Sequence, residues 1–521
     1  MTVRASALVL TFALSTAAAQ AASPPPESRS PESRSPDAQS RSSPVEPKAH
    51  AASPPIDWSP YTLESFDGDT LEAELGTLEV PENRRAADRP SEKVTLHFVR
   101  LKSTAERPGA PIVYLSGGPG ASGIWAGRWA LDDFRELSRV ADVILLDQRG
   151  TGLSDRGLFC AGPEGPPDLN LFAAGEAQTR AVLEVSADCR RQLAERGIDL
   201  AGYTTPESAD DLEALRRALD VPTISLLGFS YGTHLGLEML RRHGEVLERV
   251  VLIGTEGPDH TRKLPSTLDT HLRKLSLLAA RRPEVAAEVP DFYALLRKVL
   301  TTLEKDPIDV PIEMRDGTQL TLPVNAEGLR ALLAADLGDA SDFPFFPALL
   351  RTIDRGDPSL LAWFARKRFS PTIGIPALYF AVDGASGISP ERRLRIEREA
   401  EQSVMGSGVS GFFEVRDALG VEPLGESFRS PVVSDVETLF VSGALDANTP
   451  PHQAEEMRWG LPRSSHLVID NAGHEDMFGW DALTDVLVRF FKDGDVSEVS
   501  LARPEPRFLT VAEAKKERLG E

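Results

Sequence analysis

The chain alternates between short apolar runs and longer segments in which apolar residues recur every three or four positions. Continuous apolar runs are typical of parallel strands buried on both faces, and the longer spacing is typical of the helices that cover them. Such runs begin at Pro111, Ala141, Thr223, Arg249, Thr438 and His466. Two earlier runs, from Thr77 and Lys93, predict a leading antiparallel pair. The pattern predicts an α/β fold with a mostly parallel sheet flanked by helices.

The connection between the strands that contain Ile253 and Thr438 is far longer than an ordinary loop. Helical spacing fills much of it, in residues 266–280, 285–303 and 326–337. The stretch "VPIEMRDGTQLTLPV" predicts a hairpin that turns at Asp316 and Gly317. We therefore expect a large, mainly helical cap inserted between core strands.

The two ends of the chain lack these patterns. Arg4, the apolar residues 8–14 and the small residues up to Ala21 are typical of an export signal. The Ser/Pro repeats in residues 23–44 cannot bury enough apolar surface to fold. We predict a signal peptide (1–21), a disordered Pro/Ser-rich linker (22–57), a first core part (58–257), the cap (258–430), a second core part (431–495) and a peripheral C-terminal tail (496–521).

Charge and composition narrow the function. A net charge of −22 over 521 residues repels nucleic acid and anionic membranes, so neither is an expected partner. No segment after the export signal has the ~20 apolar residues of a membrane helix. The glycine-rich loop at 116–123 lacks the Lys-Ser/Thr ending of a phosphate-binding loop, and we expect neither a cofactor nor a metal ion. A periplasmic or secreted protein is predicted.

A serine between two glycines is the first candidate for chemistry. In "LLGFSYGTHLG", Ser230 follows a predicted strand and precedes a predicted helix. Gly-x-Ser-x-Gly in that context forms a sharp turn that lifts the hydroxyl clear of the sheet. We predict that Ser230 is a catalytic nucleophile.

A serine nucleophile needs a base, and the base needs a carboxylate that holds one tautomer. Asp446 and His474 each follow a late predicted strand, in the chain order Ser, acid, His that this arrangement uses. Asp435 precedes its strand and Asp470 lies within one, so both suit the role less well. The sequence therefore predicts Ser230, Asp446 and His474 as the catalytic residues.

The reaction also needs N–H donors for a developing oxyanion. The residue after the nucleophile, Tyr231, supplies one, and the loop "SGGPGASG" supplies the other. We assign Gly118 to the second position, with either neighbour as the alternative.

The motifs together resemble a known family. "SGGPGASG", "DQRGTGLSD", "GFSYGTHLG", "SGALDANTPPHQAEEM" and "NAGHE" resemble the serine exopeptidases of the α/β-hydrolase fold, the proline iminopeptidase and tripeptidyl aminopeptidase family. The resemblance implies this fold, a helical cap over the site, and cleavage of residues or short peptides from free N-termini. Ser116 stands where proline iminopeptidases typically have His, and the cap lacks the paired cysteines of many tripeptidyl relatives. The resemblance therefore supports hydrolysis by this chain more strongly than it supports any particular substrate specificity.

An aminopeptidase must hold a protonated amine, for which a carboxylate beside the nucleophile is suited. Glu256 lies at a strand's carboxyl end and is our candidate, although a salt-bridged loop residue is the alternative. Asp383 in "FAVDGAS" is a weaker candidate of the same kind.

Cys160 and Cys189 are the two cysteines of the chain. In an exported protein such a pair favours a disulfide, with two buried thiols as the alternative.

Three functions remain open at this point. The favoured one is a serine exopeptidase acting on peptides with a free N-terminus. An esterase or amidase with the same catalytic residues is the second, because fold and triad do not fix the leaving group. A non-catalytic binding protein is the third. The oligomeric state is not predicted.

Overall fold

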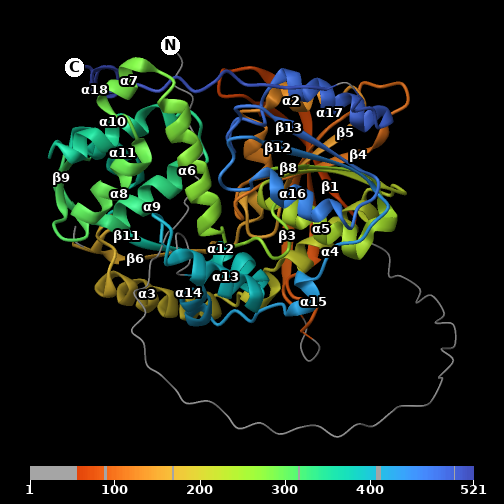
Figure 1. Ribbon diagram of the computed structural model, residues 1–521. Coiled ribbons are helices and arrows are strands. Elements are labelled where there is room, and N and C mark those ends of the chain that lie inside the picture. The colour runs from red at the N-terminus through yellow and green to blue at the C-terminus, as the bar shows by residue number, and fades with distance from the viewer. Residues whose placement is uncertain (1–54, 87–90, 167–168, 315–316, 407–411, 498) are drawn as a thin grey trace, which may run out of the picture.

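A nine-stranded sheet forms the centre of one half of the molecule, on the right in Figure 1. The computed structural model describes residues 55–86, 91–166, 169–314, 317–406, 412–497 and 499–521. The strands are β1 (Asp57–Glu64), β2 (Thr70–Pro81), β3 (Lys93–Leu101), β4 (Gly109–Leu115), β5 (Ala141–Asp147), β7 (Ile224–Phe229), β8 (Leu247–Ile253), β12 (Glu437–Gly443) and β13 (Ser464–Ile469). Their spatial order is β1-β2-β3-β5-β4-β7-β8-β12-β13. Pairing is antiparallel from β1 to β5 and parallel from there to β13.

The apolar runs of the sequence account for most of this sheet. The six long runs form β4, β5, β7, β8, β12 and β13, and the two earlier runs lie in the antiparallel pair β2 and β3. The edge strand β1 is the one the pattern misses, since its side chains are mostly exposed and it contains Pro60. Proline is tolerated there because an edge strand has no neighbour on one side.

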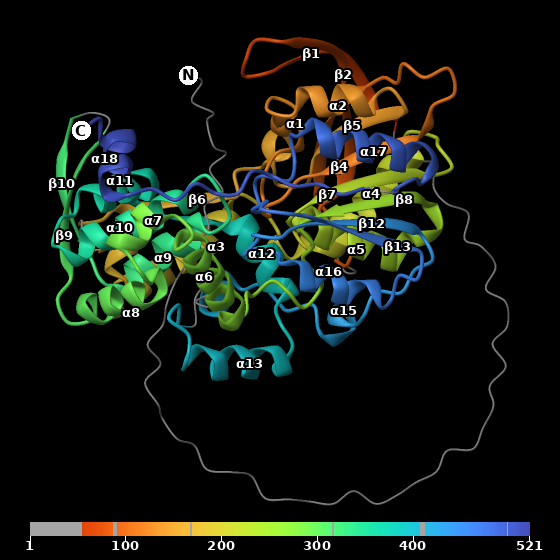
Figure 2. The same ribbon diagram turned by 45° about the horizontal axis from the view of Figure 1, so that its top comes forward.

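Helices cover both faces of the sheet, as Figure 2 shows. Apolar side chains pack α1 (Gly123–Ala126), α2 (Leu131–Leu137) and α17 (Asp481–Asp493) against one face. The other face packs against α4 (Thr205–Ala218), α5 (Tyr231–His243) and α16 (Pro451–Arg458). Within the described ranges, no helix combines the length and apolar character needed to cross a membrane.

A mainly helical domain lies beside the sheet and has its own apolar core, on the left in Figure 1. The elements between β8 and β12 are α6 (Pro265–Ala279), α7 (Pro283–Glu288), α8 (Phe292–Leu303), β9 (Ile308–Glu313), β10 (Gln319–Val324), α9 (Ala326–Asp336), α10 (Phe346–Asp354), α11 (Ser359–Arg368), β11 (Thr372–Pro376), α12 (Ala377–Ser386), α13 (Pro390–Ala400), α14 (Phe412–Leu419) and α15 (Glu426–Arg429). The elements from α6 to α11 supply the core of the helical domain, whereas apolar side chains of β11, α12 and α14 pack in the cluster shared with the sheet. β9 and β10 form the expected hairpin, while Asp316 in its turn lies outside the described residues.

Two segments outside the predicted cap also pack against cap elements. β6 (Phe159–Glu164) pairs with β11, and α3 (Glu176–Glu195) packs against α14, although both fall within the predicted first core part. The predicted C-terminal tail is not peripheral, because its helix α18 (Val511–Leu519) packs on α10 and α11. Residues 1–54, which hold the predicted signal peptide and most of the predicted linker, lie outside the described residues.

These differences have a physical reason. β6 pairs with a strand more than two hundred residues later, and no local spacing encodes such a partner. The tail has few apolar side chains, yet Phe508, Leu509 and Ala514 are buried in the core of the helical domain. A short segment can dock through a few such residues without producing a periodic pattern.

Candidate active site

Ser230 occupies the sharp turn between β7 and α5. Its φ of 54° and ψ of −121° lie outside the regions that side-chain-bearing residues ordinarily adopt, and such strain concentrates at functional sites. The flanking glycines permit the turn. A Cβ on Gly228 would lie 2.6 Å from the carbonyl oxygen of Gly232, and one on Gly232 would collide with the carbonyl of Leu115. The Ser230 N–H donates to the carbonyl of Ile253 at 2.9 Å, which ties the turn to the end of β8.

Asp446 follows β12, is 3% exposed, and has both carboxylate oxygens occupied. The backbone N–H groups of Asn448 and Thr449 each donate to Oδ1 at 2.8 Å, and the Thr449 hydroxyl donates to Oδ2 at 2.7 Å. Nδ1 of His474 lies 2.8 Å from the same Oδ2. Burial works against the charged form, but the attraction of His474 and these hydrogen bonds outweigh it and lower the pKa of Asp446 to about 2.

His474 lies in the loop after β13 and is as buried as Asp446. Burial of the imidazole opposes its protonation, yet the adjacent Asp446 carboxylate prevails, so the pKa of His474 is raised above its ordinary value. Because Nδ1 faces Asp446, Nε2 is the atom left for proton transfer. This is the arrangement of a general base held in one orientation.

The structure brings His474 to the serine turn. The imidazole centroid lies 5.1 Å from that of Phe229, the residue before Ser230. On the other side, a Cβ on Gly254 would lie 3.0 Å from Cε1 of the imidazole. No hydrogen bond joins Oγ of Ser230 to the imidazole in the described structure, and contacts of this kind commonly tighten only when substrate binds. Of the predicted relay, the hydrogen bond between Asp446 and His474 is present.

The two predicted oxyanion donors flank the serine. Tyr231 is the first residue of α5, so its N–H has no carbonyl partner inside the helix. Gly118 has a φ of 114°, a conformation that suits glycine. The preceding Gly117 passes so close that a Cβ there would lie 2.9 Å from Cβ of Ser230. Among the described residues, neither the Gly118 N–H nor the Tyr231 N–H donates to a protein acceptor.

Two family models match the chain in the segments that carry these residues. A model of the alpha/beta hydrolase fold matches residues 110–291, and a model described as TAP-like protein matches residues 417–500. Together the two segments take in just over half of the chain and include the serine turn and both late loops. The chain has the α/β-hydrolase fold.

The named relatives of this α/β-hydrolase match only part of the chain, at 30% identity or less. A tripeptidyl aminopeptidase from Streptomyces lividans is 30% identical over 174 residues, which are 31% of this chain and 28% of the relative. Serine protease Hip1 from Mycobacterium bovis is 28% identical over 234 residues, 42% of each chain. The match thus spans less than half of either relative. A serine hydrolase structure from Cycloclasticus covers 81% of this chain at 16% identity, but its TM-score of 0.36 gives the likeness no weight.

The α/β-hydrolase holds two further carboxyl groups near the serine turn, those of Glu256 and Asp383. Oε1 of Glu256 and Oδ1 of Asp383 are buried, and neither has a hydrogen-bond partner among the described residues. Burial, and next the charge of Glu256, raises the pKa of Asp383 well above its ordinary value. The Thr233 hydroxyl accepts from the Glu256 N–H at 2.8 Å and donates to the Ser230 carbonyl at 2.6 Å, so Glu256 is joined to the serine turn.

Sequence reasoning missed two side chains of this site. Nζ of Lys263 lies 3.4 Å from Oε2 of Glu256, so part of the salt-bridged alternative for Glu256 is present. Thr449 supports both Asp446 and His474, with its hydroxyl 3.0 Å from Nδ1 of the histidine. The Thr449 position directly follows "LDAN" in the matched motif, which was the one available signal. No sequence pattern indicated a role for Lys263.

The disulfide predicted from the two cysteines is present. Cys160 in β6 bonds to Cys189 in α3, with 5.5 Å between their Cα atoms. The bond therefore ties β6 to α3, and both cysteines are buried in the apolar cluster that also takes in side chains of α12 and α14.

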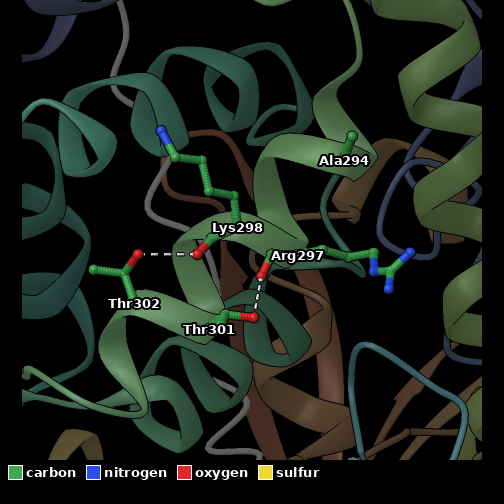
Figure 3. Close-up of a pocket in the computed structure, with 5 residues that line it drawn as sticks. All are labelled: Ala294, Arg297, Lys298, Thr301 and Thr302. Atoms are coloured by element: carbon green, nitrogen blue, oxygen red, sulfur yellow. Dashed lines mark hydrogen bonds between the residues drawn. The ribbon is translucent and has the colours of Figure 1, made fainter.

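A shallow hollow on the outer side of α8, about 360 Å³ in volume, is distinct from this site. Figure 3 shows that Thr301 and Thr302 donate to carbonyls of their own helix, while Arg297 and Lys298 extend in different directions. Lys298 already pairs with Asp354 at 2.5 Å. The hollow thus lacks converging polar groups. Within the described ranges, no cluster of three or more His, Cys, Asp or Glu side chains is arranged to hold a metal ion.

Proposed function

We propose that the protein is a serine peptidase that releases N-terminal residues or short peptides through an acyl-enzyme on Ser230. One observation carries the proposal. The buried Asp446–His474 pair, 2.8 Å apart, lies beside a serine that is held in a strained turn. The Asp446 carboxylate stabilises the imidazolium that forms when His474 takes a proton, and this favours proton removal from a nearby hydroxyl.

The chemistry proceeds in two halves. Oγ of Ser230 attacks the acyl carbon while His474 accepts the hydroxyl proton on Nε2. The N–H groups of Tyr231 and Gly118 bind the oxyanion, and His474 then protonates the departing amine as the C–N bond breaks. A water molecule next attacks the ester, passes one proton to His474 and releases the acid. Ser230 regains that proton, so the enzyme returns to its starting state.

Recognition of a free N-terminus is assigned to Glu256, with Asp383 as the second group. An unpaired oxygen of a buried carboxylate is costly, and a substrate ammonium that binds there would offset the cost. Both carboxyl groups have such an oxygen among the described residues, and Glu256 is joined through Thr233 to the Ser230 carbonyl. These observations favour peptides with a free amino end as substrates.

We further propose that the protein is exported, to the periplasm or outside the cell. The apolar stretch and small residues near the start support this location. The Cys160–Cys189 disulfide supports it independently, since such bonds persist in oxidising compartments.

An esterase or amidase that acts on small acyl compounds is the second candidate. The observation in its favour is Lys263, which already supplies a cation to Glu256 at 3.4 Å. If that pairing persists in the working enzyme, a substrate ammonium has less to gain there, and uncharged acyl groups become suitable substrates.

A substrate panel separates the two. Fluorogenic prolyl, alanyl and tripeptidyl amides, their N-acetylated forms and a short-chain nitrophenyl ester are assayed with wild type and Ser230→Ala. We expect amide turnover that disappears on N-acetylation and falls by ~10³-fold or more without the serine. Ester turnover alone would favour the second candidate. Turnover that survives Ser230→Ala would overturn both.

A further inference from the structure

The loop that carries His474 is held by segments from outside the sheet domain. We call residues 470–476 the histidine loop. Asn471 at its start has a φ of 58°, and the Gly473 N–H donates to Oδ2 of Asp476 at 2.8 Å. Inside the sheet domain, the loop's Ala472 carbonyl accepts from the Leu445 N–H at 2.8 Å. The His474 side chain also contacts Asp446 and Thr449, and further backbone contacts of the loop come from two distant stretches of chain.

The first is the turn after α9, residues 337–342, which we call the cap turn. The Gly338 carbonyl accepts from the Glu475 N–H at 3.1 Å, directly beside His474. A Cβ on Gly338 would lie 2.6 Å from Nδ2 of Asn448 and 3.7 Å from Cβ of His474. The cap turn therefore packs closely against the histidine loop and the Asp446 loop, and a side chain at 338 would force the Asn448 amide to move.

The second stretch is residues 499–510, which we call the C-terminal strap. Arg503 donates twice to the Asp476 carbonyl, from Nε at 3.0 Å and Nη2 at 2.6 Å. The backbone of Arg503 also bonds to the start of the histidine loop. Its N–H donates to the Asp470 carbonyl at 2.8 Å, and its carbonyl accepts from Nδ2 of Asn471 at 3.0 Å. The Leu501 carbonyl accepts from the Asp470 N–H at 3.0 Å. Both ends of the loop are thus tied to the strap.

The strap then crosses to the helical domain, as the blue chain at the top of Figure 1 shows. Phe508 and Leu509 are buried there, and the Leu509 N–H donates to the Pro344 carbonyl at 2.9 Å. Beyond it, Glu513 pairs with Arg282 at 2.7 Å. The cap turn and the strap therefore fix the histidine loop to the same neighbouring domain.

A general base must stay within a fraction of an ångström of its working position, and a misplacement of about 1 Å can cost ~100-fold in rate. Here the serine is fixed by strands β7 and β8, but the histidine loop is fixed largely from outside. We propose that Arg503 of the strap and Gly338 of the cap turn are positioning residues that keep His474 aligned with Asp446 and Ser230. This inference rests on the proposed serine-hydrolase function.

The experiment uses the full chain and an uncharged nitrophenyl ester, so that amine binding does not enter. The variants are Arg503→Met, Arg503→Lys and Gly338→Ala. Arg507→Met is the strap control, because Arg507 is exposed and pairs with Glu513 rather than with the histidine loop. Gly175→Ala is the glycine control, since a Cβ there meets nothing closer than 3.9 Å. Active-site titration with a fluorophosphonate gives kcat per functional site, and a melting curve reports folding.

We expect Arg503→Met and Gly338→Ala to lower kcat by ~10- to 100-fold with KM changed less than about twofold. Arg503→Lys should recover part of the loss, because one charged donor remains. Both controls should match wild type. The acidic limb of the kcat profile should also move to lower pH in Arg503→Met. The charged groups acting on His474 are Asp446, Glu475 and Lys263, and a displaced imidazole loses the close attraction of Asp446.

Unchanged kcat per titrated site in both variants, even with a lower melting temperature, would leave a structural role only and overturn the inference. An unshifted pH limb would do the same. If Arg503→Met does not fold, Gly338→Ala decides. A wild type that fluorophosphonate does not label at Ser230 would instead remove the proposed function, and the inference with it.

Discussion

The carboxyl groups on the two sides of Ser230 differ in one respect. On one side Asp446 has both oxygens occupied, by two backbone N–H groups, a hydroxyl and an imidazole. On the other side Glu256 and Asp383 each keep a buried oxygen that no described group satisfies. The first side is complete within the folded protein, whereas the oxygens on the second are the ones we propose a substrate ammonium to occupy.

This difference distinguishes a carboxylate that the fold has already positioned, Asp446, from the two carboxyl groups that we propose recognise the substrate amine. Asp446 must hold the imidazole before substrate arrives, so its partners belong to the fold. Glu256 and Asp383 gain only if a donor enters, and Lys263 at 3.4 Å is a long and incomplete substitute. Substitutions on the first side should therefore change kcat for every substrate, and those on the second should change KM for free-amine substrates alone.

The largest effect is expected for Asp446→Asn. The amide cannot stabilise the imidazolium and favours the wrong tautomer, so kcat on amides and esters alike should fall by ~10³- to 10⁴-fold. Steady-state kinetics with a nitrophenyl ester and a tripeptidyl amide measure it. Asp435→Asn, at an exposed position, is the matched control and should behave as wild type. A loss below about tenfold would show that Asp446 is not part of the relay.

The next largest effect is expected for Glu256→Gln, and only for substrates with a free amine. Loss of a charge-assisted bond to the amine predicts a KM that is ~10- to 100-fold higher for free-amine peptides. The KM values for the N-acetylated amides and for the nitrophenyl ester should be unaffected. Lys263→Met should have the opposite sign, a lower KM for free amines, since it removes the competing cation. Equal changes for blocked and free substrates would assign Glu256 a structural role.

The pH dependence should distinguish the two sides without mutation. His474 must be neutral to accept a proton, so kcat/KM for the blocked ester should rise ~10-fold per pH unit up to its pKa. Because Asp446 raises the pKa of His474, this limb should lie above that of a free imidazole. Free-amine peptides should show a second, falling limb near pH ~8 as the α-amino group loses its proton. Identical profiles for both substrates would argue against amine recognition.

Asp383→Asn should have the smallest effect. Burial and the nearby Glu256 charge raise the pKa of Asp383, so its carboxyl tends to keep a proton and an amide resembles it. We expect KM for free-amine peptides to change by less than ~3-fold, measured beside Glu256→Gln. An effect as large as that of Glu256→Gln would make Asp383 the main charged contact.

Local patterns predicted the sheet and the serine turn because their determinants are close in sequence. Gly228 and Gly232 lie two positions on either side of Ser230, and each long apolar run corresponds to one strand. The order of late loops also placed Asp446 and His474 correctly enough for their side chains to bond. The need for glycine on both sides of this turn can therefore be recognised from a single sequence.

The features that the sequence did not predict depend on contacts between residues that are far apart in the chain. No local spacing in the sequence encodes the pairing of β6 with β11 or the bond from Arg503 to the carbonyl of Asp476. Lys263 and Thr449 are ordinary polar residues whose roles come from which carboxylate they meet. The edge strand β1 lacks an apolar pattern because one of its sides has no neighbour.

The disulfide has a consequence for how the protein would respond to its surroundings. Cys160 and Cys189 brace α3, which packs on α14, and α14 in turn packs on α12, where Asp383 lies. The Asp446–His474 pair lies at the ends of β12 and β13, and its histidine loop is held by the cap turn and the C-terminal strap. A reducing compartment would therefore loosen the support behind α12 and the Asp383 carboxyl, so the redox state of the surroundings would reach the site through the packing of three helices.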